Sequence, residues 1–202
     1  MKTTIAGILI MLVIAAGCKK EKPDSYLIET SQSSIIWRGT SPIAENTGTF
    51  SVNGNNLKVK NGKLINGTFN VPINSLNVTN LPPDLKPVLT EHLLSADFFN
   101  VLVHPMAVFK IEKVDVLTGT PPDGSVANAN FVIRGSLTMI GVTKPVNFPA
   151  KVDIVNNKVS AEAQLQINRT DWGMNYAADP ALGDHHIYPM VNLKIKLVAN
   201  KN

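Results

Sequence analysis

A two-residue alternation of apolar and polar side chains runs through the last third of this 202-residue chain. Every second residue is apolar from Val146 to Ile154, again from Val159 to Ile167, and again from Val191 to Leu197. Successive side chains of a β-strand point to opposite faces of the sheet, so this pattern is typical of strands with one buried face. The alternation therefore predicts a β-sheet fold.

Shorter stretches of the same character come earlier in the chain, separated by turn signals. Asn53-Gly54 and Asn61-Gly62 are dipeptides of tight hairpin turns, so we expect each to join two neighbouring strands. Residues 84–99 break the alternation and predict one or two short helical turns, whose extent Pro87 limits. The remaining strands are expected at residues 35–38, 47–52, 56–60, 67–78, 107–116 and 131–139.

Eight or nine strands with short hairpins and one helical insertion predict an all-β domain, either an antiparallel barrel or a sandwich. Closure into a barrel removes exposed sheet edges. The interior of an eight-stranded barrel is filled by its own side chains or holds one small ligand. The alternation alone is equally consistent with a filled core and with a cavity.

The first 17 residues have the features of a bacterial signal peptide. Lys2 supplies a positive charge, residues 5–14 are an apolar run too short to span a bilayer, and residues 15–17 are small. Cys18, the single cysteine, follows directly, and the segment resembles the lipobox of bacterial lipoproteins, whose cysteine is acylated. The alternative is an ordinary secretory signal followed by a chance cysteine. The expected organisation is a signal peptide at 1–17, an acylated cysteine and tether at 18–25, and the barrel domain at 26–200.

An acylated Cys18 anchors the protein to a membrane of the cell envelope, and we expect the domain to face the periplasm. In some bacterial lipoproteins an aspartate directly after the acylated cysteine is associated with retention in the inner membrane. This chain has Lys19 at that position, so we expect attachment to the outer membrane. The net charge is +4, and basic residues are scattered except for Lys19, Lys20 and Lys22. No basic stripe interleaved with aromatic residues is present, so we expect no nucleic-acid partner.

Four sequence blocks in the rest of the chain carry a family resemblance. They read E-H-L-L-S-A-D-F-F at 91–99, G-S-L-T-M-I-G-V-T-K-P-V at 135–146, I-N-R-T-D-W-G-M at 167–174, and Gly183-Asp184 before the last strand. Together and in this order they resemble the YceI-like family, also called the polyisoprenoid-binding, lipocalin-like family, with the lipobox marking a lipoprotein sub-branch. The chain departs from the family pattern at residues 88–91 and 37–39.

The resemblance implies an eight-stranded antiparallel lipocalin-like barrel with a short helical insertion near residues 84–99. It also implies a long apolar cavity that holds a polyisoprenoid or an isoprenoid quinone as ligand, with no cofactor. Dimers are common in that family, so the resemblance makes a homodimer one expected state of this protein. Phenylalanine at Ala161 or Ala163 is expected to block ligand uptake. The residues expected to line the cavity are Trp37, Phe69, Phe109, Phe131, Ile133, Leu137, Met139, Phe148, Ala161, Ala163, Leu165, Leu193 and Ile195.

The sequence offers no catalytic set, so we expect no enzyme. It lacks the nucleophile elbow G-x-S-x-G and the phosphate-binding loop, and lipidation leaves no free thiol. The adjacent His185 and His186 do not suit a metal site, and Arg169 and Asp171 are expected to form a structural ion pair. Two other functions remain open: a filled barrel that docks another envelope protein, and an enzyme that acts on a bound lipid through a polar cluster inside the barrel.

Overall fold

The computed structural model describes residues 22–202, so the expected signal peptide and the expected acylation site at Cys18 lie outside the described residues. Most of the chain is β-strand. The elements are, in chain order, β1 (Asp24–Ile28), η1 (Thr30–Gln32), β2 (Ser34–Thr40), β3 (Glu45–Ser51), β4 (Leu57–Lys60), β5 (Lys63–Pro72), η2 (Ile73–Ser75), β6 (Asn77–Val78), α1 (Leu85–Leu94), β7 (Met106–Val116), β8 (Phe131–Met139), β9 (Val142–Val155), β10 (Lys158–Asn168), η3 (Arg169–Trp172), η4 (Pro180–His185) and β11 (Met190–Lys201).

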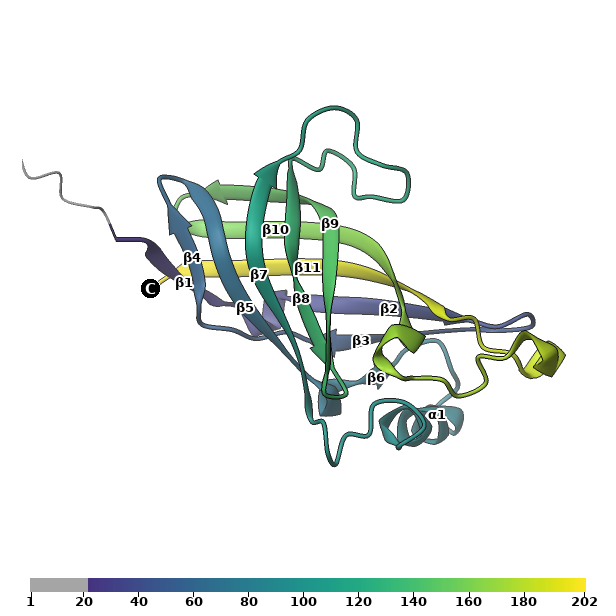
Figure 1. Ribbon diagram of the computed structural model, residues 1–202. Helices are drawn as coiled ribbons and strands as arrows, with labels where there is room; N and C mark the ends of the chain where they lie inside the picture. The colour runs from purple at the N-terminus through teal and green to yellow at the C-terminus, as the bar shows by residue number, and fades with distance from the viewer. Residues whose placement is uncertain (1–21) are drawn as a thin grey trace, which may run out of the picture.

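The strands form a closed antiparallel barrel, which confirms the predicted fold (Figure 1). The ring runs β1-β4-β5-β7-β8-β9-β10-β11 and closes because β11 pairs with β1. Eight strands therefore complete the circle, and no exposed edge is left within it.

Two more strands extend the wall of the barrel toward one end. β11 is long enough to pair with β1 through its last residues and with β2 through Asn192–Lys196, and β2 in turn pairs with β3. Asn53, just after β3, exchanges two backbone hydrogen bonds with Asn70 of β5, at 2.8 and 2.9 Å. The wall thus also closes through β2 and β3, beyond the end of the short strands β1 and β4.

The two turn predictions had different outcomes. Asn61 and Gly62 both have positive φ, 52° and 69°, and join β4 to β5 as a tight hairpin, which confirms that prediction. The prediction for Asn53-Gly54 is wrong, because the chain continues there from β3 toward β4 and Asn53 pairs with Asn70. An Asn-Gly dipeptide permits a turn, and in this case the backbone partner on β5 decides the conformation.

The helical insertion is longer than predicted. α1 is a single ten-residue helix, and Pro87 is its third residue. A proline in the first helical turn removes an N–H that has no partner within the helix, so Pro87 is compatible with the start of α1 and does not limit its length. Among residues 22–202, no helix has the length and apolar character to cross a membrane.

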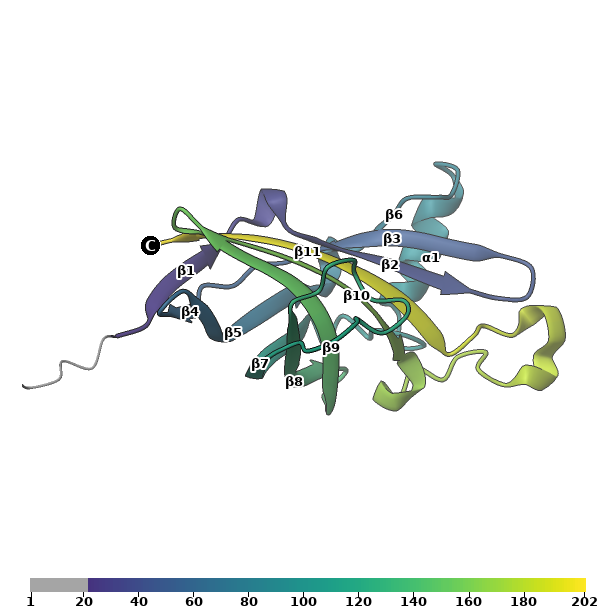
Figure 2. The same ribbon diagram turned by 90° about the horizontal axis from the view of Figure 1, so that it is seen from above.

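The two ends of the barrel differ. Figures 1 and 2 both place β1, near the N-terminus, at one end, and the β2–β3 hairpin and the yellow-green segment that holds η4 at the other. α1 lies beside β3 and β6 toward this second end and contacts β6. We call this second end the mouth end. The irregular segments of the chain gather there, so it is the place to look for an opening.

Candidate functional site

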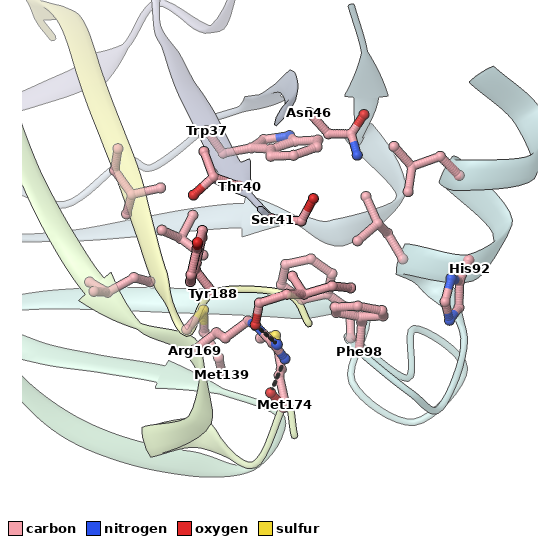
Figure 3. A pocket seen from close by; sticks show the side chains of 18 of the residues that line it. Trp37, Thr40, Ser41, Asn46, His92, Phe98, Met139, Arg169, Met174 and Tyr188 are labelled. Carbon is pink, nitrogen blue, oxygen red and sulfur yellow. Dashed lines mark hydrogen bonds between the residues drawn. The ribbon is translucent and has the colours of Figure 1, made fainter. Parts of the chain in front are cut away.

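A cavity of about 380 Å³ opens at the mouth end, and we call it the outer cavity (Figure 3). Three parts of the chain surround it: the β2–β3 hairpin, α1, and the segment between β10 and β11. Ile43 at the hairpin tip and Tyr188 in the last segment line the cavity yet are 71% and 41% exposed, so they mark its rim. The volume lies in the range of small-molecule sites.

The walls of the outer cavity are inward-facing side chains of the barrel. Trp37 of β2 is part of this wall, and it fits because Gly48 on the neighbouring strand has no side chain. A Cβ at Gly48 would lie 2.7 Å from the indole ring, closer than atoms can approach. Leu137, Met139 and Leu193 complete the apolar wall toward the barrel interior.

A second, smaller cavity of about 110 Å³ continues into the barrel, and we call it the inner cavity. Its lining is apolar apart from Glu162. The two cavities meet at four residues that line both: Ile35, Val71, Leu137 and Leu193. We call these four the neck. The shared residues make the two cavities neighbours, with the outer one open at the mouth end and the inner one deeper in the barrel.

The expected lining residues divide between the two cavities, with one exception. Phe131 lines neither cavity; it is the first residue of β8 and packs, partly buried, against the core. Alternation predicts which face of a strand is inward but not the depth at which a cavity lies. The outer cavity takes Trp37, Leu137, Met139 and Leu193; the inner cavity takes Phe69, Phe109, Ile133, Leu137, Phe148, Ala161, Ala163, Leu165, Leu193 and Ile195.

The block at 91–99 builds the aromatic side of the outer cavity. Ser95 ends α1 by donating a hydrogen bond from its hydroxyl to the carbonyl of His92, at 2.8 Å. The chain then turns so that Phe98 is buried on the cavity wall, with its ring centroid 5.1 Å from that of His92 and 5.6 Å from that of Tyr176. His92 and Phe98 line the cavity, and the strand pattern did not reveal them because they lie outside any strand.

The block at 167–174 brings a cation to the same wall. Arg169 directly follows β10, is 4% exposed, and lines the outer cavity with its guanidinium carbon 5.6 Å from the centre of the Phe98 ring (Figure 3). Burial lowers the pKa of Arg169 from its usual value, because the charged form loses its hydration. The guanidinium donates to the backbone carbonyls of Met174, Tyr176 and Ile187 and so holds the segment that leads to β11.

The expected ion pair between Arg169 and Asp171 does not form. Asp171 is exposed on the short helix η3, whereas Arg169 points into the protein. The prediction assumed an extended strand, in which residues two apart share a face, but β10 ends at Asn168 and the chain turns. Among residues 22–202, no three side chains of His, Cys, Asp or Glu gather as metal ligands.

Solved structures of similar shape share this fold. BcnA of Burkholderia cenocepacia superposes with a TM-score of 0.64 at 16% identity, covering 85% of this chain and 98% of its own. A polyisoprenoid binding domain from Saccharophagus degradans, implicated in plant cell wall breakdown, gives 0.64 at 14% identity over 88% and 98%. The YceI protein of Campylobacter jejuni gives 0.54 at 20% identity over 70% and 75%.

Sequence comparison points the same way. The UPF0312 proteins of Pectobacterium carotovorum and Pectobacterium atrosepticum are each 42% identical over 62 residues, which is 31% of this chain and only 27% of their own length. The model of the YceI-like domain, by contrast, matches residues 26–199, which spans the barrel from β1 to β11. This chain therefore belongs to the YceI-like domain family.

Proposed function

We propose that this protein binds a lipid with a long isoprenoid chain inside its barrel and performs no chemistry on it. The observation that carries the proposal is the pair of neighbouring apolar cavities, of which the outer one opens at the mouth end and the inner one shares the four neck residues. Each Å² of apolar ligand surface removed from water contributes about 25 cal/mol, so apolar cavity walls of this kind favour a long apolar chain. The Saccharophagus degradans relative, described as polyisoprenoid binding, supports the same ligand class.

The cavities also weigh against the two rival functions. A filled barrel that only docks a partner has no use for an apolar cavity of about 380 Å³. An enzyme acting on the lipid needs a converging set of acid, base or nucleophile near the reacting atoms. Among residues 22–202, no three side chains of His, Cys, Asp or Glu gather, and Arg169 can only donate, so binding is the function that this geometry favours.

A titration tests the proposal directly. Ubiquinone or a polyprenol is added to delipidated protein while the intrinsic fluorescence of tryptophan is recorded, because Trp37 lines the outer cavity. We expect a saturable change with one ligand per chain. Trp37→Phe should remove most of the change while Trp172 still reports the fold. A response that never saturates, or one that is unchanged in Trp37→Phe, contradicts binding in this cavity.

Ala163→Phe is expected to shorten the chain that the barrel accepts rather than to abolish binding. Ala163 lines the inner cavity only, and a cavity of comparable size holds a single benzene ring, so one phenyl group would fill it. We expect the affinity for a long isoprenoid chain to fall about tenfold, ~1.4 kcal/mol, while a short chain confined to the outer cavity binds nearly as before. Gln164→Phe, on the opposite face of β10, is the control. Equal losses for both chain lengths contradict this arrangement.

We further propose that Cys18 is acylated and holds the protein to a membrane of the cell envelope, with the barrel in the periplasm and the outer membrane as the attachment site. The mouth end lies opposite β1 (Figures 1 and 2). The six peptide links from Cys18 to Asp24 reach about 20 Å at most, whereas a strand as long as β11 spans about 40 Å. On so short a tether the mouth faces away from the anchoring membrane, which suits presentation of the lipid to an acceptor.

Cys18→Ser tests the anchor. The substitution removes the thiol that would carry the lipid, and we expect the protein to move from the membrane fraction to the soluble fraction after cell breakage. Affinity for ligand should remain within about twofold of the wild type, since Cys18 precedes the first barrel strand, β1, in the sequence. Mass spectrometry of the N-terminal peptide of the wild type gives a second reading, an added diacylglycerol. A wild-type protein that is already soluble and unmodified contradicts the anchor but leaves ligand binding intact.

A further inference from the structure

The end of the barrel opposite the mouth end is basic. The start of β1, the β4–β5 hairpin, the turn between β9 and β10, and the end of β11 lie together there (Figures 1 and 2). We call it the basic end. Its lysines are far apart in the sequence, and strand pairing gathers them at the protein surface: Lys22, Lys58, Lys60, Lys63, Lys158 and Lys201.

Most of this positive charge has no acidic partner in the fold. Asp24 pairs with Lys201, with 2.9 Å between the carboxylate oxygen and Nζ. None of the ion pairs found among residues 22–202 includes the other five lysines. Glu29, just after β1, and the end of the chain at Asn202 are the further negative groups on these segments. Positive charge is therefore in excess at this end.

Two of the lysines face each other. Lys60 and Lys63 are directly opposite residues of β4 and β5, on either side of the tight turn at Asn61-Gly62. Like charges in this arrangement repel and destabilise the strand pair. A negative charge outside the protein would relieve the repulsion, so the hairpin favours an anionic partner.

The mouth end has the opposite charge. Residues 84–105 and 169–189, which include the helix and the segment that surround the outer cavity, hold six acidic side chains and two basic ones. One of the two basic side chains is that of Arg169, which is buried and bonded to backbone carbonyls. An anionic surface would therefore attract the basic end and repel the mouth end.

We propose that the basic end binds the anionic surface of a lipid bilayer and holds the barrel upright on it. The inference rests on the proposed anchor for which membrane this is. Two observations favour a bilayer as the partner. The tether from Cys18 reaches about 20 Å at most and adds Lys19 and Lys20, so the basic end stays close to the anchoring membrane. Exposed lysines spread over several strands also suit a plane of many charges better than one small anion.

Vesicle binding by the chain without its acyl groups tests the proposal. Cys18→Ser protein, produced without residues 1–17, is mixed with vesicles of phosphatidylcholine, with or without phosphatidylglycerol, and sedimented. We expect binding only to the anionic vesicles. Binding should disappear as salt rises from about 0.1 to 1 M, because the screening length falls from about 10 to 3 Å. Absence of binding, or equal binding to both kinds of vesicle, overturns the proposal. Neither result bears on the affinity for isoprenoid lipids or on acylation, which are measured separately.

The double variant Lys60→Gln/Lys63→Gln locates the binding surface. We expect its partitioning onto anionic vesicles to fall about tenfold or more, since each lysine near such a surface contributes roughly fivefold. Lys194→Gln/Lys196→Gln is the matched control, with the same loss of charge on exposed residues of β11 that pair with β2. The control should stay within about twofold, because its lysines lie more than a screening length from the basic end. Equal losses in the two variants would mean that net charge alone drives binding and would overturn the proposal.

A fluorescent probe tests the orientation. Cys18→Ser leaves no cysteine, so Ile65→Cys or Ile43→Cys adds a single site for an environment-sensitive dye. Ile65 lies two residues after Lys63 on the same face of β5, and Ile43 lies at the mouth rim. On anionic vesicles we expect the emission to shift to the blue at Ile65 and to stay unchanged at Ile43. The reverse pattern would place the mouth on the membrane and overturn the proposal.

Discussion

Phenylalanine at Gly39 is expected to abolish ligand binding while the barrel still folds. Gly39 lies on β2 two residues after Trp37, so it shares the inward face, and it lines the outer cavity. A Cβ built on Gly39 meets nothing within 4 Å, and its φ is not in the left-handed region, so a side chain can be added without strain on the backbone. The phenyl ring would then occupy the space that the ligand needs. We expect the Kd to rise by about 100-fold or more, which is ~2.7 kcal/mol.

Ile36→Phe is the matched control for this variant. Ile36 lies on the same strand, is 44% exposed, and is absent from the lining of both cavities. The same ring on the outward face should leave the Kd within about twofold. Fluorescence titration gives the affinities, and thermal unfolding followed by circular dichroism shows whether each variant folds. Normal binding by a folded Gly39→Phe protein would mean that the ligand occupies another part of the molecule.

Gly135→Ala is expected to have the largest effect on stability. Gly135 lies on β8 opposite Ile111 of β7, where the backbone of Lys110 and the ring of Phe109 approach closely. A Cβ at this position would lie 2.6 Å from the Cζ atom of Phe109, so the ring or the strand must move. Overpacking of this kind costs about 2–3 kcal/mol. In a domain of this size the melting temperature should fall by roughly 5–10 °C.

Gly39→Ala is the control for stability, because both glycines lie within strands but only Gly135 is crowded. We expect a change of less than about 0.5 kcal/mol at Gly39. Thermal or urea unfolding measures both variants. If Gly135→Ala is as stable as Gly39→Ala, the close packing of β7 against β8 described above is incorrect.

The long strands could be predicted because they depend on local pattern alone. β9 and β10 alternate over nine residues and β11 over seven, and each buries the face that the alternation indicates. β1 was not predicted. It has five residues, and its conformation depends on pairing with β4 and with the end of β11, which are distant in sequence. A short stretch of sequence does not show which distant segment it will pair with.

The candidate site was predictable only in part, for a related reason. Leu137 and Leu193 were placed inward by alternation, Trp37 was among the residues expected to line the cavity, and all three do line the outer cavity. Whether that interior is filled or hollow depends on how side chains of different strands pack together, as the Trp37 ring does in the space left by Gly48 on the neighbouring strand. Arg169 and Phe98 lie outside the strands, so no periodicity assigned them a face. Both stand in the blocks that carry the family resemblance, and that was the only signal for them in the sequence.

The most direct test of lipid binding is native mass spectrometry of the protein purified from bacterial membranes in mild detergent. The native and denatured masses are compared, and the protein is extracted with organic solvent. We predict that the native mass exceeds the denatured mass by one lipid and that the extract contains a molecule with an isoprenoid chain in amounts equal to the protein. Equal native and denatured masses, in a protein that also fails to take up added polyprenyl lipids, would contradict lipid binding as its function.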